Sequence, residues 1–305
     1  MRVALLTTGY TELMGLAATL HRLFPGHDFQ VIPQLPDPSR PFAGITSNRL
    51  PAPSIGVPDA ADKLAQAAVS LVDPDRPDPH DLALVLDDLE LTNLDQPALV
   101  IETFARKVFE HIACCTTDDD RRARLHTAAR DRISFHLAVP MIEAWFFADP
   151  AGPARAGVPS GTTVCFDPTQ HDAEGFHTDD PAYLAATEDD CPCWRRKKIR
   201  KHRPKWWGAG DRSRHPKGYL QWLTIDGAAP GCTRYLESRE GVAALEGLSW
   251  ADVLCYRRRC TYARALIHDL SEALGQQPQL EQWQGERADA TQLHLGDQNR
   301  TIRNH

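Results

Sequence analysis

The chain of 305 residues carries a formal net charge of -7, with 42% hydrophobic and 25% charged residues. These ordinary globular values exclude wholesale disorder, and the acidic balance excludes a generally basic nucleic-acid coat protein. Charged or polar residues break every apolar run before it reaches the length of a membrane span. The N-terminus turns polar too quickly for a signal peptide, and the eight cysteines show no small disulfide framework. We therefore expect a cytoplasmic protein without a membrane segment.

The first half of the chain alternates between strand and helix patterns. Short apolar runs that end in glycine, acids or proline predict strands, and apolar residues at helical spacing predict helices. The alternation predicts crossover connections and a mostly parallel sheet. The predicted strands are residues 2–10, 28–35, 82–90 and 133–140, and the predicted helices are residues 11–24, 60–73, 97–115, 118–131 and 141–150.

One connection in this half is long. Residues 36–58 are rich in proline, serine and glycine, which predicts a loop. Such a loop inside a compact domain is more often functional than idle.

The second half of the chain changes character. Residues 160–190 are polar and acidic, residues 191–217 are densely basic, and helical patterns return from Gly218 onward. We predict an α/β domain over residues 1–155, a polar and basic insertion over 156–217, and a mostly helical C-terminal part over 218–305.

A cluster of acids ends the predicted strand "LALVLDDLE". Asp87, Asp88 and Glu90 follow a run of buried leucines, and neighbouring carboxylates repel each other unless a cation compensates. Ligands of parallel sheets bind at the carboxyl ends of the strands, and magnesium accepts one or two protein carboxylates. The pattern fits a magnesium or manganese site, and it also fits a solvated turn that caps the next helix.

A second acid follows the last predicted strand. Glu143 lies in "HLAVPMIEAWFFADP" among large apolar side chains, so its carboxylate must be paired, metal-bound or shifted in pKa. An acid at a helix start that interacts with the helix dipole, with the aromatic residues forming core, gives the same pattern. Because both acid clusters end predicted strands, we expect all four acids to converge on one electronegative pocket.

Three segments in this order resemble the Toprim family of nucleotidyl transferases and hydrolases: "TTGYTE", "LVLDDLE" and "AVPMIEAWFFADP". The chain is more similar to bacterial Toprim-like proteins encoded beside ATPases in anti-phage defence loci, which also share the patterns "HPKGYLQWL" and "YLESREGVAALEGLSWADVL". The resemblance covers about residues 2–255, interrupted by the basic segment. It implies a Rossmann-like sheet flanked by helices, magnesium-dependent phosphodiester chemistry and an ATPase partner.

The resemblance also implies roles for individual residues. Toprim enzymes use a glutamate after the first strand as general acid or base, and aspartates to hold magnesium. Asp87 or Asp88 would be the metal ligand, with Glu90 in the place of the second aspartate. Thr8 stands where the catalytic glutamate is expected, and threonine is no acid or base near neutral pH. Either Glu12 or Glu143 takes that role, or the chain is not catalytic.

The basic run interleaves arginine and lysine with tryptophan. Cations bind phosphates and indoles stack on bases, so the composition favours nucleic-acid binding. A solvated loop, or a docking patch for an acidic protein, has the same composition. The candidate contact residues are Arg195, Arg196, Lys197, Lys198, Arg200, Lys201, Arg203, Lys205, Trp206 and Lys217.

Cysteines near this run raise the question of zinc. Cys191 and Cys193 lie close in sequence to Cys165, His171 and His177. Cys-x-Cys is a poor match to the usual zinc knuckle, so we expect ordinary thiols.

The leading hypothesis is a magnesium-dependent nuclease that serves as the effector of a bacterial defence system with an ATPase partner. The alternative is a non-catalytic Toprim-like subunit that binds nucleic acid or regulates its ATPase. Thr8 favours the alternative, whereas the acids at positions 87, 88, 90 and 143 favour the nuclease. The sequence leaves open DNA, RNA or a small nucleotide as substrate, and whether the chain forms a homo-oligomer.

Overall fold

The computed structural model describes residues 1–34, 37–51, 59–187, 212–225, 235–255, 260–280 and 300–304. The chain forms two compact units, one of Met1–Ala138 with Thr261–His305 and one of Val139–Cys260. This division differs from the predicted boundaries after residues 155 and 217. The sheet unit ends with its last strand, and the final helix returns to pack on that strand.

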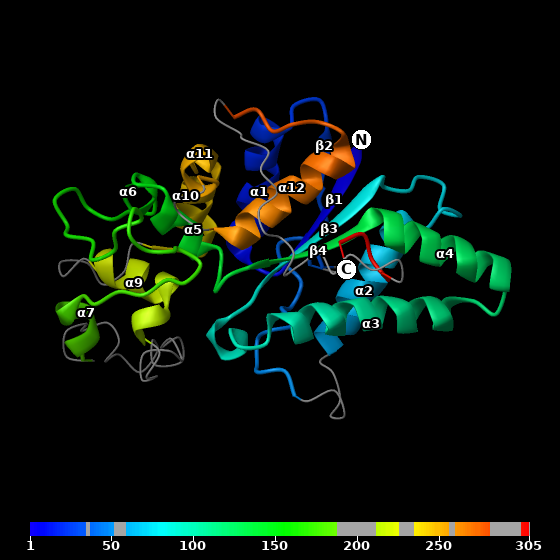
Figure 1. Ribbon diagram of the computed structural model, residues 1–305, viewed down its shortest axis with the longest axis horizontal. Helices are drawn as coiled ribbons and strands as arrows, with labels where there is room; N and C mark the ends of the chain where they lie inside the picture. Colours follow the sequence, from blue (N-terminus) through cyan, green and yellow to red (C-terminus); the bar gives the residue numbers. More distant parts are fainter. Residues whose placement is uncertain are drawn as a thin grey trace. The chain divides into compact units, whose positions relative to one another are not determined.

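The first unit is built on a four-stranded, all-parallel sheet in the order β2-β1-β3-β4 (Figure 1). Thr7 pairs with Leu86 and Asp88 pairs with Ala138, so β1, β3 and β4 end at one edge of the sheet. Parallel strands are covered on both faces, which is why β3 and β4 are buried throughout. The four predicted strands and the α/β fold are confirmed. The strands are β1 (Arg2–Thr7), β2 (Asp28–Val31), β3 (Leu82–Asp88) and β4 (Ile133–Ala138).

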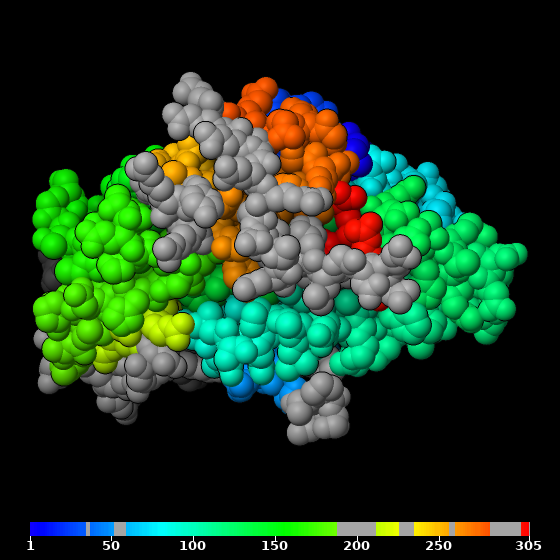
Figure 2. Space-filling model, in the orientation of Figure 1, coloured from blue at the N-terminus to red at the C-terminus, as the bar shows by residue number. Residues whose placement is uncertain are grey.

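Helices cover both faces of this sheet. In Figure 1, α1 and α12 lie on one side of the strands, and α2 and α3 lie on the other. Helices α2, α3 and α4 pack against one another, while α12 packs on β4. Figure 2 shows the C-terminal residues 300–304 (red) at the surface beside α12 (orange). The helices of this unit are α1 (Tyr10–Leu23), α2 (Asp59–Val72), α3 (Pro97–Cys115), α4 (Asp119–Arg132) and α12 (Thr261–Leu274).

The second unit consists of short helices around an aromatic core. Phe147 and Phe166 both pack against Phe176, with ring centroids 4.7 and 5.1 Å apart. The aromatic residues that follow Glu143 in the sequence are therefore core. No helix in the described parts of the chain is long and apolar enough to span a bilayer. The helices are α5 (Glu143–Ala148), α6 (Gly152–Arg155), α7 (Pro181–Ala185), α9 (Pro216–Leu223), α10 (Val242–Glu246) and α11 (Trp250–Val253).

Candidate functional site

The strand order reverses direction between β1 and β3. From β1 the chain moves outward to β2, whereas β3 leads in the opposite direction to β4. Open α/β sheets bind their ligands at such a reversal, outside the carboxyl ends of the strands. Thr8 and Gly9 follow β1, and Asp87 and Asp88 end β3. Asp87 and Asp88 therefore lie at the edge of the sheet where a ligand is expected.

Asp87 is buried at this edge and is bound through both carboxylate oxygens. Its Oδ1 accepts a hydrogen bond from Thr8 Oγ1 at 2.6 Å, and its Oδ2 accepts one from the Ile45 backbone N–H at 3.0 Å. Burial raises the pKa of Asp87 to about 7, and the nearby charge of Glu90 adds to this, although the two hydrogen bonds oppose it. A carboxyl with this pKa changes charge near neutral pH.

Thr8 has a structural role where the Toprim pattern has a catalytic glutamate. Its hydroxyl donates to Asp87 and is part-buried. The residue that departs from the pattern therefore holds the first of the strand-end acids in place.

The predicted long loop covers Asp87. The Phe42 N–H donates to Thr7 O at 3.0 Å, and the Thr46 hydroxyl donates to the Asp88 carbonyl. A Cβ atom on Gly44 would come within 3.0 Å of Asp87 Oδ1, so glycine permits the close approach. We call residues 42–50 the covering loop.

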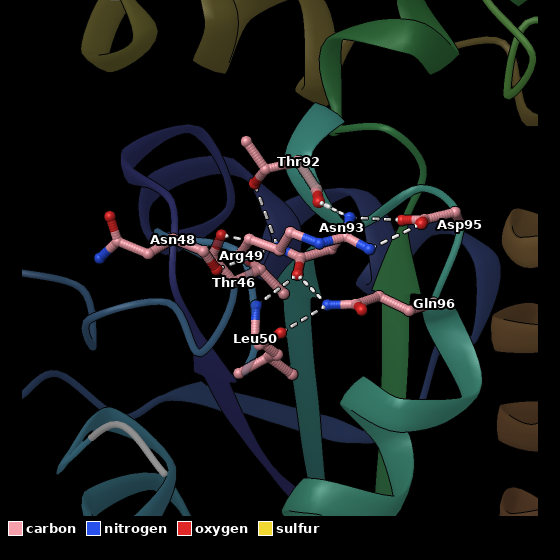
Figure 3. Close-up of polar contacts among 8 residues, drawn as sticks. All are labelled: Thr46, Asn48, Arg49, Leu50, Thr92, Asn93, Asp95 and Gln96. Carbon is pink, nitrogen blue, oxygen red and sulfur yellow. Dashed lines mark hydrogen bonds and ion pairs between the residues drawn. The ribbon is translucent and has the colours of Figure 1, made fainter. Parts of the chain in front are cut away.

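The side chain of Asn93 fastens the covering loop to the connection after β3 (Figure 3). Asn93 is fully buried, and its Nδ2 donates to the carbonyls of Thr46 at 3.0 Å and Asn48 at 3.2 Å. Its Oδ1 accepts from Leu50 N at 2.9 Å and from Gln96 Nε2 at 2.8 Å. The Asn93 amide therefore forms hydrogen bonds with backbone groups of an irregular loop. Burying those groups without partners would cost free energy.

An ion pair at the surface adds to this contact. Arg49 forms two hydrogen bonds of 2.7 Å to the Asp95 carboxylate and one of 2.8 Å to Thr92 O (Figure 3). Both charged side chains are more than half exposed, so the pair adds little stability. Its planar geometry instead fixes the orientation of the loop.

Glu90 has a backbone conformation that L-amino acids rarely adopt. Its φ is 58° and its ψ is 150°, which is a region used almost only by glycine. Among the described residues it is the one non-glycine residue with positive φ. Such strain costs about 1–3 kcal/mol and is found at active sites and ligand-binding turns.

Glu12 is buried in the first turn of α1 and lies against Gly9. A Cβ atom on Gly9 would come within 2.1 Å of Glu12 Oε2. The carboxylate therefore occupies space beside the residue that follows Thr8. Of the two acids predicted to replace the missing glutamate, Glu12 belongs to the same unit as Asp87.

Glu143 belongs to the second unit, where it has partners of its own. Its Oε1 accepts a hydrogen bond from the Tyr235 hydroxyl at 2.8 Å and lies 3.6 Å from Lys217 Nζ. Its Oε2 is buried with no hydrogen-bond partner among the described residues. Burial raises the pKa of Glu143, Lys217 lowers it and Glu237 raises it further. The convergence of Glu143 with the acids of β3 stays a prediction.

Most of the predicted nucleic-acid contacts fall outside the described residues. This applies to Arg195, Arg196, Lys197, Lys198, Arg200, Lys201, Arg203, Lys205 and Trp206, and also to Cys191 and Cys193. Lys217 is described, and its ammonium lies 3.6 Å from Glu143 and 3.4 Å from Glu237. In this arrangement it balances acids of its own unit.

Asp87 and Asp88 at the end of β3, and Glu90 just after it, suit magnesium by their chemistry. In the described parts of the chain, no three His, Cys, Asp or Glu side chains gather as a metal site. Magnesium keeps several waters and needs one or two carboxylates, so a complete protein cage is not required. The repulsion between Glu90 and Asp87 is what a cation would relieve. Of the two ligand pairs that the resemblance implies, Asp88 with Glu90 would hold the ion without breaking the two hydrogen bonds of Asp87.

The residues that bind Asp87 and the covering loop were not predicted from sequence patterns. The Ile45 amide, Asn93 and Gln96 all act through contacts between distant segments. The signal that could have pointed to them is a pair of short polar stretches, "TSNRL" in the loop and "LTNLDQ" after β3.

Comparisons of the chain with protein-family models, curated proteins and solved structures found no match.

Proposed function

We propose that this chain is a Toprim-like, magnesium-dependent nuclease that cleaves phosphodiester bonds at the carboxyl edge of its sheet. The observation that supports this most directly is the acid cluster at the end of β3, where the strand order reverses. Burial raises the pKa of Asp87 there to about 7, and Glu90 has a strained backbone. Shifted carboxyls and strained residues cost stability, and proteins concentrate them at functional sites.

Residues of the first unit would have separate roles in such a reaction. Asp88 and Glu90 would hold magnesium, which neutralises charge on the phosphate when bound. Asp87 positions the covering loop through Ile45, and Thr8 orients Asp87. Glu12 is the candidate general acid or base, because it is buried beside Gly9 at the end of β1.

The proposed substrate and the proposed ATPase partner rest on the sequence. The basic run from Arg195 to Lys217 supports nucleic acid as the substrate, since clustered cations neutralise phosphates. The role as a defence effector with an ATPase partner rests on the resemblance to Toprim-like proteins of defence loci.

A cleavage assay with matched acid substitutions tests the proposal. The purified chain, with and without a candidate ATPase partner and ATP, is incubated with labelled single-stranded and duplex DNA and RNA. We expect cleavage that requires magnesium, and a loss of about 100-fold or more in Asp88→Asn and Glu90→Gln. Glu102→Gln, an exposed acid on α3, is the control and should leave the rate unchanged. Cleavage that persists in EDTA or in Asp88→Asn would falsify the proposed metal chemistry.

The role of Glu12 has its own test. In Gly9→Ala the new methyl would collide with the Glu12 carboxylate, while the Gly9 backbone has an ordinary φ of -111°. We expect the substitution to displace the carboxylate and lower the rate about as much as Glu12→Gln does, by about 100-fold. Gly175→Ala is the control, because its Cβ would meet nothing closer than 3.6 Å. Full activity in both Gly9→Ala and Glu12→Gln would exclude Glu12 as the acid or base.

The hydrogen bond from Thr8 to Asp87 favours a second candidate, a non-catalytic subunit that binds nucleic acid or regulates its ATPase partner. A site without the catalytic glutamate can keep Asp87, Asp88 and Glu90 for structural reasons. In that case wild type and Asp88→Asn would be equally inactive, and Thr8→Glu would create magnesium-dependent cleavage. Thr8→Val, which only removes the hydroxyl, is the matched control.

A further inference from the structure

The C-terminal residues Arg300–Asn304, which we call the tail, bind the outer edge of β4. Among the described residues this strand lies at the edge of the sheet, so one side of its backbone has no neighbouring strand there. The Arg303 N–H donates to Ile133 O at 2.7 Å. The Asn304 side chain completes the pairing: its Oδ1 accepts from Phe135 N at 3.0 Å, and its Nδ2 donates to Phe135 O at 2.7 Å. The tail therefore satisfies the exposed edge as a paired strand would.

Side chains of the tail make the contact specific. Ile302 is fully buried, and Asn304 is 3% exposed. Arg303 Nε lies 3.0 Å from Asp269 Oδ1 on α12, and Asp269 Oδ2 lies 3.1 Å from His136 Nε2. Arg303 therefore has an acidic partner and Asn304 has a backbone partner, while Ile302 is buried.

We propose that the outer edge of β4, together with α12, is a peptide-binding site, and that it takes the tail of a second copy of this chain as well as its own. Addition of an extended segment to a sheet edge is a general mode of peptide recognition. Nineteen residues, 281–299, separate the tail from Leu280, and a chain of that length spans at most about 60 Å. Exchange of an identical segment between copies needs no new contact, so the cost of such a dimer is low.

This site is separate from the proposed nuclease site. The tail contacts Ile133 and Phe135 in the first half of β4, whereas the acids of β3 lie level with the end of that strand. The inference therefore stands or falls independently of the cleavage reaction.

A binding assay in trans tests the site itself. A chain that ends at residue 299 is mixed with a fluorescent peptide of residues 300–305, after circular dichroism has confirmed that the chain is folded. We expect saturable binding that weakens about ten-fold or more when the peptide carries Asn304→Ala, because two hydrogen bonds to Phe135 are lost. A peptide of scrambled sequence is the control. A folded chain that does not bind the peptide overturns the proposal.

A second assay uses the full chain and does not depend on the truncated chain being folded. Two batches labelled with donor and acceptor fluorophores are mixed at increasing concentration. We expect energy transfer that grows with concentration, is competed by the free peptide and is lost in Asn304→Ala. Absence of energy transfer up to about 100 μM, which lies within the range of weak protein association, excludes the second copy as the occupant.

Discussion

Asp87 in the first unit and Glu143 in the second are both fully buried, and burial raises the pKa of both carboxyls. Their surroundings differ. Both oxygens of Asp87 accept hydrogen bonds, from Thr8 and from the backbone of Ile45. Glu143 accepts one from Tyr235, while its second oxygen has no partner in the described parts of the chain. Its opposite charge is Lys217, at 3.6 Å.

The comparison distinguishes two ways of keeping an acid inside a protein. Neutral donors hold Asp87, and those donors belong to the covering loop and to the end of β1. Glu143 depends on a cation that it shares with Glu237. Removing a neighbouring cation should therefore destabilise the protein through Glu143. Removing a hydrogen-bond acceptor should destabilise it more strongly through Asp87.

The largest expected effect is the dependence of stability on pH. Below about pH 4 an aspartate is protonated in the folded and unfolded states alike, so the contribution of Asp87 is fully present. Between about pH 4 and the folded pKa of about 7, only the unfolded state releases its proton. Stability should therefore fall as pH rises through this window, by about 4 kcal/mol in total from the difference between the two pKa values.

Urea unfolding between pH 4 and pH 8 measures this slope. Glu143 lowers stability with rising pH in the same way. The contribution of Asp87 is therefore the difference in slope between wild type and Asp87→Asn, because asparagine has no proton to release. Equal slopes in the two proteins would mean that Asp87 is ionised throughout the window.

The second prediction concerns the hydrogen bonds of Asp87. Asp87→Ala removes the acceptor of Thr8 and of the Ile45 amide, and we expect a loss of about 2–3 kcal/mol at pH 5. Asparagine keeps an oxygen for Ile45, and the Thr8 hydroxyl can rotate to accept from its amide. Asp87→Asn should therefore cost less than about 1 kcal/mol. If both variants unfold at the same urea concentration as wild type, the covering loop does not depend on Asp87.

The fold could be predicted from the sequence because its elements depend on local patterns. Helix α3 has the predicted bounds of residues 97–115, and each predicted strand is present. The pairing of Thr8 with Asp87 could not be predicted, since it joins two strand ends that are far apart in sequence. The same applies to the return of α12 to β4, which decides the division into units.

Glu143 illustrates a second limit. Helix α5 follows β4 after only a few residues, so no sequence pattern indicates that Glu143 belongs to another unit. Its contacts with Lys217 and Tyr235 come from segments much later in the chain. Periodicity carries no information about such partners, which are set by packing of the whole unit.

The third prediction tests the charge that holds Glu143. Lys217→Met leaves a buried acid without its cation, and we expect a loss of about 2 kcal/mol at pH 8. The loss should shrink at pH 5, where Glu143 with its raised pKa is more readily protonated. Lys63→Met, at an exposed site on α2, is the control. In the double variant Lys217→Met with Glu143→Leu, stability should recover, since an apolar pair replaces the buried charges. A double variant no more stable than Lys217→Met would contradict this account.

The smallest expected effect distinguishes strain from charge at the end of β3. Glycine adopts the backbone angles of Glu90 without cost, so Glu90→Gly should raise stability by about 1 kcal/mol. Glu90→Ala removes the same carboxylate but keeps a Cβ atom in the strained conformation, and it should not gain this stability. Under the proposed function, both variants lose magnesium-dependent cleavage. Thermal unfolding of the three proteins at one pH separates the two contributions. Equal stability of the glycine and alanine variants would show that the backbone of Glu90 stores no strain, and that Glu90 affects the site through its charge alone.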